Sequence, residues 1–254
     1  PHSIFVDELR EIEVSKGEVD WPPLPERFMD GITFASQFTG NANDFGIADR
    51  HAENVHVVGG KVYATDNRCL VEYSIGASPT FSIAPKRIAL LKSFGTPSLA
   101  SLKEDRLRFM WENGNRLAFN GEKPLNTNLL EKIPQQFDAR DWYGFREMDA
   151  AWRDQIIGHF SYKLHRDSVG MIHFAPDRIV GGRLDNRPDT QLSIETYVGK
   201  DVTFEQKQLL RALKVAEEFK FVHGDDASHF LFKAENVRGM LILNRPIDPV
   251  PVLS

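Results

Sequence analysis

The stretch TFEQKQLLRALKVAEEF, residues 203–219, decides how this chain is interpreted. Its apolar residues recur at helical spacing and predict one buried face: Phe204, Leu209, Leu210, Leu213 and Ala216. Thr203 and Gln206 have the spacing of a capping box, in which each side chain bonds the backbone N–H of the other end of the first turn. The pattern therefore predicts an amphipathic helix that begins at Thr203 and packs against a core.

Positive charge follows the other side of this predicted helix. Lys207, Arg211 and Lys214 stand at i, i+4 and i+7, so they are expected on one line. A shorter relative, PKRIALLKSF, occupies residues 85–94. Its residues expected to face inward are Ile88, Leu91 and Phe94, and its positive residues, with no acid between them, are Lys86, Arg87 and Lys92. One such helix is typical of a solvated face, but the repetition favours a surface that lies against a polyanion.

Length and composition limit the classes of protein to consider. The chain has 254 residues, 41% of them hydrophobic and 26% charged, which suits two globular domains of ordinary size. We expect neither a membrane span nor a signal peptide, because no apolar run is long enough and the start PHSIFVDELREIEV lacks a basic region followed by an apolar one. Together with the single cysteine, Cys69, these features predict a protein of the reducing cytoplasm.

The charge balance and the single cysteine narrow the chemistry further. A net charge of −5 argues against a general nucleic-acid binder, but not against one that gathers its cations on one surface. Cys69 excludes an intramolecular disulfide and any multi-cysteine zinc site, and we expect it to be a small buried residue. No P-loop, GxGxxG motif or other cofactor motif is present in the sequence, so no cofactor is expected.

The predicted elements of the first half run strand, helix, several strands, helix and strands, and the second half begins with its helix and then follows the same order. Helices are expected at 25–38, 85–94, 148–164 and 203–219. Strands are expected at 9–14, 54–58, 61–65, 69–74, 81–83, 107–111, 116–119, 169–174, 178–180, 192–198, 220–223, 230–233 and 239–243. Residues 135–147 show no sustained period and are interpreted as a linker between domains at 1–137 and 138–254.

The two halves of the chain resemble each other in sequence. LLKSF at 90–94 matches LLRAL at 209–213, and ENGNR at 112–116 parallels ENVR at 235–238. Weak self-similarity over a domain-sized period favours an internal duplication, with each copy made of two helices on antiparallel strands.

Three segments resemble the bacterial β sliding clamps, which are DNA polymerase processivity factors. VYATDNRCL at 62–70 is similar to that family's strand ending in Ala-Thr-Asp-Gly-His-Arg-Leu, and SIAPKR at 82–87 is similar to its entry into the second inner helix. The run 201–243 resembles the family's last domain. The likeness covers residues 25–247. It implies an α+β DNA clamp fold of two repeated domains, each with two helices packed on antiparallel sheets.

The resemblance implies a six-domain ring that is threaded on duplex DNA. A β clamp supplies three domains per subunit and this chain two, so the expected assembly is a head-to-tail homotrimer, as in two-domain phage clamps. Such a ring is non-enzymatic and tethers a DNA polymerase and a clamp loader through short peptide motifs. The residues expected to contact the phosphate backbone without reading sequence are Lys86, Arg87, Lys92, Lys207, Arg211 and Lys214, with Arg27 and Arg153 as weaker members.

The resemblance also implies a pocket that accepts the partner's peptide. By position its lining would be Thr65, Leu70, Pro134, Ile242 and Leu243. The chain departs from the family here: the residues before Leu70 are Asn67, Arg68 and Cys69, and the tail 248–254 runs beyond the family's usual end. Leu70 and Leu243 are equally compatible with ordinary core positions.

Two other classes of function stay open at this stage. A metal-dependent hydrolase would use His51, His56 and Asp66, although an i, i+5 spacing of the histidines suits neither one helix face nor one strand face. A clamp-like adaptor would bind peptides without encircling DNA. The tripeptide His165-Arg166-Asp167 copies a kinase motif, but its companion motifs are absent from the sequence.

Overall fold

The structure is a computed structural model. It describes residues 20–40, 50–103, 106–120, 132, 134–135, 137–161, 170–183, 188–223 and 228–242. The strand expected at 9–14 and the tail 248–254 lie outside these ranges. The chain forms two compact units: unit 1 comprises Pro1–Asp66 and Glu72–Arg140, and unit 2 comprises Asn67–Val71 and Asp141–Ser254. Among the described residues, no helix combines the length and the apolar character that a membrane crossing requires.

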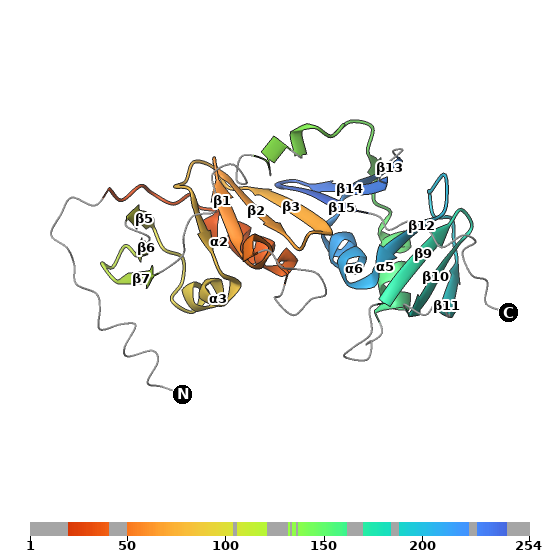
Figure 1. Ribbon diagram of the computed structural model, residues 1–254, viewed down its shortest axis with the longest axis horizontal. Coiled ribbons are helices and arrows are strands. Elements are labelled where there is room, and N and C mark those ends of the chain that lie inside the picture. Colours follow the sequence, from red (N-terminus) through yellow and green to blue (C-terminus); the bar gives the residue numbers. More distant parts are fainter. Residues whose placement is uncertain are drawn as a thin grey trace. The chain divides into compact units, whose positions relative to one another are not determined.

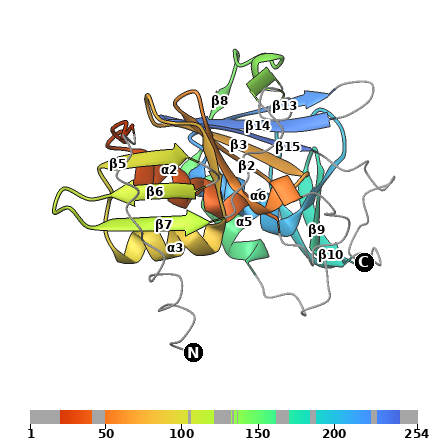
Figure 2. The same ribbon diagram turned by 60° about the vertical axis from the view of Figure 1, so that its left-hand side comes forward.

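Unit 1 contains two helices and two antiparallel sheets. The helical elements are α2 (Phe28–Ala35), the 3-10 turns Ser36–Phe38 and Arg50–Glu53, and α3 (Pro85–Ser93). The first sheet has the order β4-β1-β2-β3, with β1 (Val55–Val58), β2 (Lys61–Thr65), β3 (Cys69–Ser74) and β4 (Phe81–Ile83). The second sheet has the order β5-β6-β7, with β5 (Leu99–Lys103), β6 (Arg106–Met110) and β7 (Arg116–Asn120), and these three strands lie side by side in Figure 2.

Local sequence explains the turns and the core of unit 1. Gly59 and Gly60 both adopt positive φ, as a tight hairpin between twisted strands requires, and Val58 then pairs with Lys61. Phe28 of α2 lies 6.0 Å, between ring centroids, from Phe81 of β4 and also from Phe109 of β6. One helix therefore joins the two sheets through a shared aromatic core.

Unit 2 contains the same kinds of element. Its helices are α5 (Ala150–Phe160) and α6 (Gln206–Val215). One sheet has the order β11-β10-β9-β12, with β9 (Gly170–Ala175), β10 (Arg178–Arg183), β11 (Pro188–Ser193) and β12 (Val202–Glu205), and Figure 1 shows these strands side by side. The other has the order β15-β14-β13-β8, with β8 (Arg146–Glu147), β13 (Glu218–His223), β14 (Ser228–Ala234) and β15 (Val237–Ile242).

The core of unit 2 is also aromatic. Phe204 of β12 packs edge-to-face against Phe174 at 5.0 Å and against Phe230 at 5.9 Å. Trp152 of α5 stacks on Phe219 of β13 at 5.4 Å. Asp149 begins α5 by accepting a hydrogen bond from the backbone N–H of Trp152, which places this indole against the sheets.

The structure confirms that the two halves repeat one fold. In each unit the first sheet closes by pairing its first strand with the strand just before the second helix: β1 with β4, and β9 with β12. In each of these strand pairs, the side chain of a buried histidine is hydrogen-bonded to a hydroxyl group on the opposite strand. His56 Nδ1 lies 2.8 Å from Ser82 Oγ, and His173 Nδ1 lies 2.8 Å from Thr203 Oγ1. Two such buried hydrogen bonds at equivalent positions are a strong sign of duplication.

The helix expected at 203–219 begins later and ends earlier. Thr203 lies in β12, where its hydroxyl pairs with His173, so it does not cap the helix. Glu205 is the N-cap of α6 without a side-chain cap bond, and the Gln206 amide instead donates to the carbonyl of Phe160. The capping-box prediction was wrong because a cross-strand hydrogen bond used the threonine.

Three smaller expectations also differ from the structure. Phe94, expected to face inward, is 54% exposed at the end of α3. The segment interpreted as a linker contains helical residues around Phe137, which is fully buried against Tyr63. The strand expected at 192–198 lies instead at β11, Pro188–Ser193. Cys69 is buried, as predicted.

Candidate nucleic-acid interface

Helix α6 carries the predicted basic line. Lys207 and Lys214 are exposed and Arg211 is half-buried, and at 3.6 residues per turn the three lie within an arc of about 60°. Leu209, Ala212 and Leu213 are buried on the opposite side. The burial of the leucine stripe therefore fixes the rotation of α6 and turns its cations to the surface.

Helix α3 presents its cations differently. Lys86 and Lys92 are exposed, and Arg87 is half-buried with its guanidinium 5.1 Å from the centroid of the Phe119 ring. The three positions are about 100–140° apart around the helix. Ile88 and Leu91, as predicted, are buried between Arg87 and Lys92. The charge on α3 is therefore spread around the helix, and the expectation that it matches α6 was wrong.

The first helix of each unit contributes little positive charge. Arg27 is exposed at the N-cap of α2 and has other interactions within the chain. Arg153 of α5 is half-buried and forms an ion pair with Asp154 at 2.9 Å. The role of both arginines as weaker members of the DNA-binding set stays a prediction.

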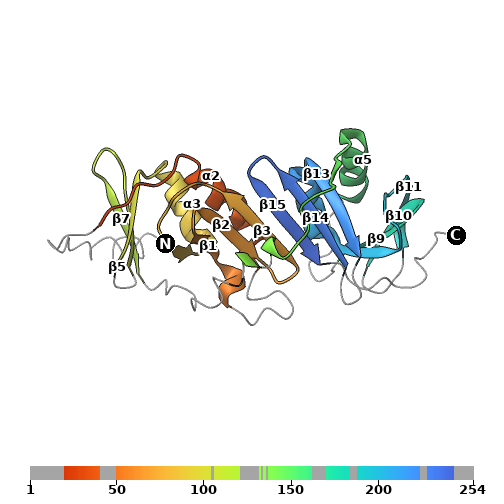
Figure 3. The same cartoon turned by 90° about the horizontal axis from the view of Figure 1, so that it is seen from above.

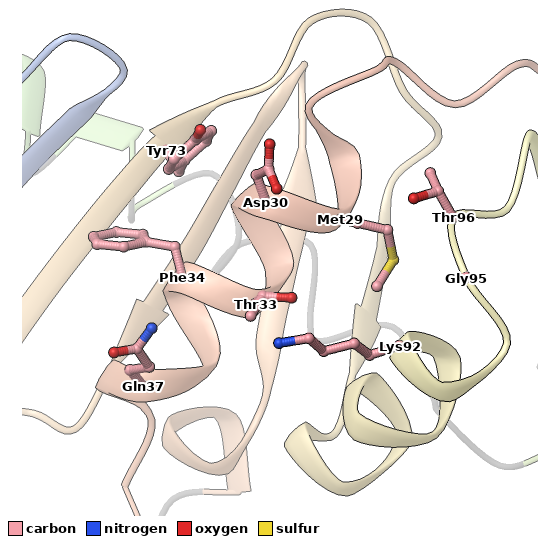
Figure 4. Close-up of a pocket in the computed structure, with 9 residues that line it drawn as sticks. All are labelled: Met29, Asp30, Thr33, Phe34, Gln37, Tyr73, Lys92, Gly95 and Thr96. Carbon is pink, nitrogen blue, oxygen red and sulfur yellow. The ribbon is translucent and has the colours of Figure 1, made fainter.

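A surface hollow of about 480 Å³ lies between α2 and α3. Figure 4 shows that the Lys92 ammonium points toward Thr33, with Met29 and Asp30 on the same side of the hollow. The Asp30 carboxylate lies apart from the Lys92 ammonium in this view. Lys92 is an exposed residue whose side chain extends toward α2.

The residues expected to line the peptide pocket are found in both units. Thr65 and Pro134 are half-buried members of unit 1. In unit 2, Leu70 is 6% exposed and Ile242 is 45% exposed, and the backbone N–H of Ile242 donates to the carbonyl of Arg68 at 2.8 Å. Leu243 lies outside the described residues. Ile242 is therefore the large apolar side chain of this set that a ligand can reach.

The geometry gives His56 an ordinary structural role. It is fully buried and bonded to Ser82, and Asp66 is a buried residue with interactions of its own within the chain. The side chain of His51 lies outside what the structure describes. Among the described residues, no group of three or more histidine, cysteine, aspartate or glutamate side chains is placed to hold a metal ion.

One charged surface was missed by the sequence analysis. Arg106 and Arg108 alternate along β6 with the buried residues Leu107 and Phe109, so both arginines face away from the core of unit 1. Arg116 of β7 and Lys103 of β5 share this outer face by their cross-strand register. The alternation RLRF in the sequence was the signal that could have revealed it.

The fold is that of the bacterial sliding clamps. The chain is similar to a DnaN sliding clamp (DNA polymerase III subunit beta) of Bartonella birtlesii bound to griselimycin, with a TM-score of 0.65 and 13% identity over 94% of this chain and 70% of that one. It is similar to a DNA polymerase sliding clamp of Pseudomonas aeruginosa, with a TM-score of 0.61 and 14% identity over 91% and 68%.

A third similar structure is the β clamp of Helicobacter pylori bound to a DNA ligase peptide, with a TM-score of 0.53 and 13% identity over 92% of this chain and 71% of that one. No family model and no curated protein matches the sequence. The likeness lies in the fold, and the predicted α+β clamp architecture is confirmed.

Proposed function

We propose that this protein is a DNA sliding clamp, a processivity factor that encircles duplex DNA and tethers replication proteins. The observation that carries the proposal is the basic line of α6, held outward by its buried leucines, on a fold shared with sliding clamps. The protein would act without catalysis of its own, in the cytoplasm of the cell where its DNA is copied.

The chemistry of the proposed contact suits sliding. Lysine and arginine contacts to phosphate give affinity without sequence information, because the phosphates of a duplex are the same at every base pair. Lys207, Arg211 and Lys214 would supply the main contact, and Lys86 with Arg87 and Lys92 a weaker one. The net charge of −5 keeps the rest of the surface from binding nucleic acid.

Ring closure follows from the internal repeat. Residues Asn67–Val71, which include the start of β3, belong to unit 2. There the carbonyl of Arg68, just before β3, accepts a hydrogen bond from the backbone N–H of Ile242 in β15. In the repeat, β11 is the counterpart of β3 and β7 is the counterpart of β15. Among the described strands, β7 and β11 each lie at the edge of their own sheet. We assign them as the joining edges, with β7 of one copy pairing with β11 of the next.

This head-to-tail contact would close with three copies. Three chains of two domains give the six domains of a clamp ring, and two-domain clamps of this kind fit a phage origin. A head-to-tail contact uses two different edges of each copy, β7 and β11, so it can repeat from copy to copy until the ring closes.

Partner proteins would bind through short peptides. The Helicobacter pylori clamp binds a DNA ligase peptide and the Bartonella birtlesii clamp binds griselimycin, and a DNA polymerase and a clamp loader would use such a site here. We place it at Thr65, Leu70, Pro134, Ile242 and Leu243. Changing the half-exposed Ile242 to aspartate should abolish capture of a polymerase-derived peptide and leave DNA retention unchanged.

The test of the proposed function compares circular and linear DNA. Protein loaded on a nicked circle should remain bound at a salt concentration that removes electrostatic binders, and linearising the circle should release it. Equal loss from both forms would overturn the encircling ring, and continued peptide capture in that case would identify a clamp-like adaptor.

A further inference from the structure

The surface hollow of unit 1 crosses the exposed face of α2. Figure 3 shows α2 and α3 side by side on the sheet formed by β1, β2 and β3. Four residues at i, i+3, i+4 and i+7 form one outward row on α2 and on the 3-10 turn that follows it: Asp30, Thr33, Phe34 and Gln37. Tyr73 of β3 bounds the hollow on one side of this row, and Lys92 and Thr96 bound it on the α3 side.

Two half-buried aromatic rings form one wall of the hollow. Phe34 lies 5.5 Å, between ring centroids, from Tyr73, with an interplanar angle of 46°. The Tyr73 ring is held against α2, because a Cβ added to Gly31 would come within 3.1 Å of Tyr73 Cδ1. Phe34 is also 5.1 Å from the buried ring of Phe38. Packing therefore fixes both rings while part of each stays open to solvent, where a flat apolar group can stack.

The polar side chains around this wall carry charges of both signs and three neutral hydrogen-bonding groups. They are Asp30, Lys92, Thr33, Gln37 and Thr96. Within the part of the chain that the structure describes, none of these five side chains forms a hydrogen bond or an ion pair. A ligand with a negative group for Lys92 and a hydrogen-bond donor for Asp30 would satisfy both charges.

The internal repeat supplies a reference for these residues, because the first helices of the two units can be aligned. The backbone N–H of Leu24 donates to the residue before β5 at 2.8 Å, and that of Met148 donates to the residue before β13 at 2.7 Å. Four residues further on, the helices place Phe28 and Trp152 in the two cores, and both are buried. The same offset therefore relates every position of α2 to one of α5.

At the positions that line the hollow, the two helices differ. Gly158 of α5 stands where Phe34 stands on α2, although a Cβ at Gly158 would meet no atom within 4 Å and a larger residue has room there. Asp154, in the place of Asp30, forms an ion pair with Arg153 at 2.9 Å. The aromatic wall and the carboxylate without an ion-pair partner are thus features of unit 1 that the shared fold does not require.

We propose that this hollow binds a nucleotide whose base carries an amino group, as cytosine does. The base would stack on Phe34 and Tyr73, and its amino group would donate to the Asp30 carboxylate, which is the pairing that acids make with cytosine N4. The phosphate would lie at the Lys92 ammonium with the Thr33 hydroxyl as a second donor. A volume of about 480 Å³ is within the range of small-molecule sites.

A free nucleotide and a nucleotide within a single strand share this chemistry. Duplex DNA does not, because its bases remain stacked on one another. Inorganic phosphate would use Lys92 but leave the two rings unused, and the Asp30 carboxylate would repel it. The site goes beyond the proposed encircling of DNA and does not need a closed ring.

The experiment measures binding of a fluorescein-labelled oligodeoxycytidylate to the full chain by fluorescence anisotropy at low salt. It should bind at least about fivefold more tightly than the matching oligothymidylate, because thymine has a carbonyl in place of the amino group. Asp30→Ala should bring the two affinities together. Phe34→Leu should weaken binding of the oligodeoxycytidylate at least about fivefold. Phe94→Leu, which removes an exposed ring of the same unit outside the hollow, should bind as the unchanged chain does.

Photo-crosslinking of an oligonucleotide that contains 5-iododeoxycytidine gives a second readout on the unchanged chain. Crosslinks are expected at Phe34 or Tyr73. Competition by millimolar dCMP would support the site with a free nucleotide as its ligand, and crosslinking without such competition would support it with a nucleotide in a strand. Equal affinity for the two oligonucleotides, equal binding by Phe34→Leu, or crosslinks outside the hollow would overturn the proposal. Because no duplex is used, these outcomes are independent of whether the chain encircles DNA.

Discussion

The two units of this protein repeat one fold but present positive charge in different ways. In unit 2, α6 aligns Lys207, Arg211 and Lys214 on one exposed line. In unit 1, α3 distributes its cations around the helix, and the outer face of β5-β6-β7 carries the larger group. The difference teaches that the two copies share a core while the placement of their surface charges differs.

The two copies share buried hydrogen bonds between side chains. The hydrogen bonds of His56 with Ser82 and of His173 with Thr203 each join the first strand of a unit to the strand just before its second helix. A buried polar pair is costly to break on one side only, so both copies retained it. Surface charges have no such cost and can change independently.

The largest expected effect concerns α6. Replacing Lys207, Arg211 and Lys214 together by alanine should weaken duplex DNA binding by roughly two orders of magnitude at low salt, because three phosphate contacts are lost. The slope of log affinity against log salt should fall by about 2–3 units. Titration of the variant over a range of salt concentrations measures both, and an unchanged slope would remove α6 from the DNA contact.

The next effect tests the equivalence of the buried pairs. Thr203→Val and Ser82→Ala each leave a buried histidine nitrogen without its partner, and each should lower the free energy of unfolding by about 1–3 kcal/mol. Denaturant unfolding measures it, with the exposed Ser193→Ala as the control. A large cost at one site and none at the other would contradict a shared structural role.

A smaller effect is expected on α3. Replacing Lys86 and Lys92 by alanine should weaken DNA binding about tenfold and lower the salt slope by about 1–2 units, since the two residues lie on different sides of the helix. The same titration serves for comparison with α6. A loss as large as that of the α6 variant would show that the two helices contribute equally.

The smallest effect is a dependence of stability on pH. Burial lowers the pKa of His173 below its ordinary value of 6.5, so the unfolded chain takes up a proton more readily than the folded one. Stability is then highest above pH 6.5 and falls as pH decreases, by at most about 1.4 kcal/mol per pH unit for this group. Thermal unfolding between pH 7.5 and 5.5 measures it, and His173→Gln should reduce the slope.

Periodicity was sufficient for most elements of the fold. The apolar spacing located α3 and α5, and Gly59-Gly60 located the first hairpin. It failed at β12, where Thr203 and Gln206 have a helical spacing that local sequence cannot distinguish from a strand end. The deciding interaction, the bond to His173, comes from a residue 30 positions away.

The positions of the candidate DNA-binding side chains could be predicted where all of them lie on one helix. The i, i+4, i+7 spacing placed the cations of α6 correctly, and the same arithmetic applied to α3 would have shown their spread. The sheet face with Arg106 and Arg108 depends on which strands pair and in which register. That information lies in tertiary contacts, so the sequence alone gave only the alternation of one strand.

The central claim is that copies of this chain close into a ring on DNA through β7 and β11. The most direct measurement is the particle mass on nicked circular DNA after a high-salt wash, with a linearised sample beside it. The account predicts three chains of 28.9 kDa per retained particle and release on linearisation. Particles of one chain, or equal retention on linear DNA, would contradict it.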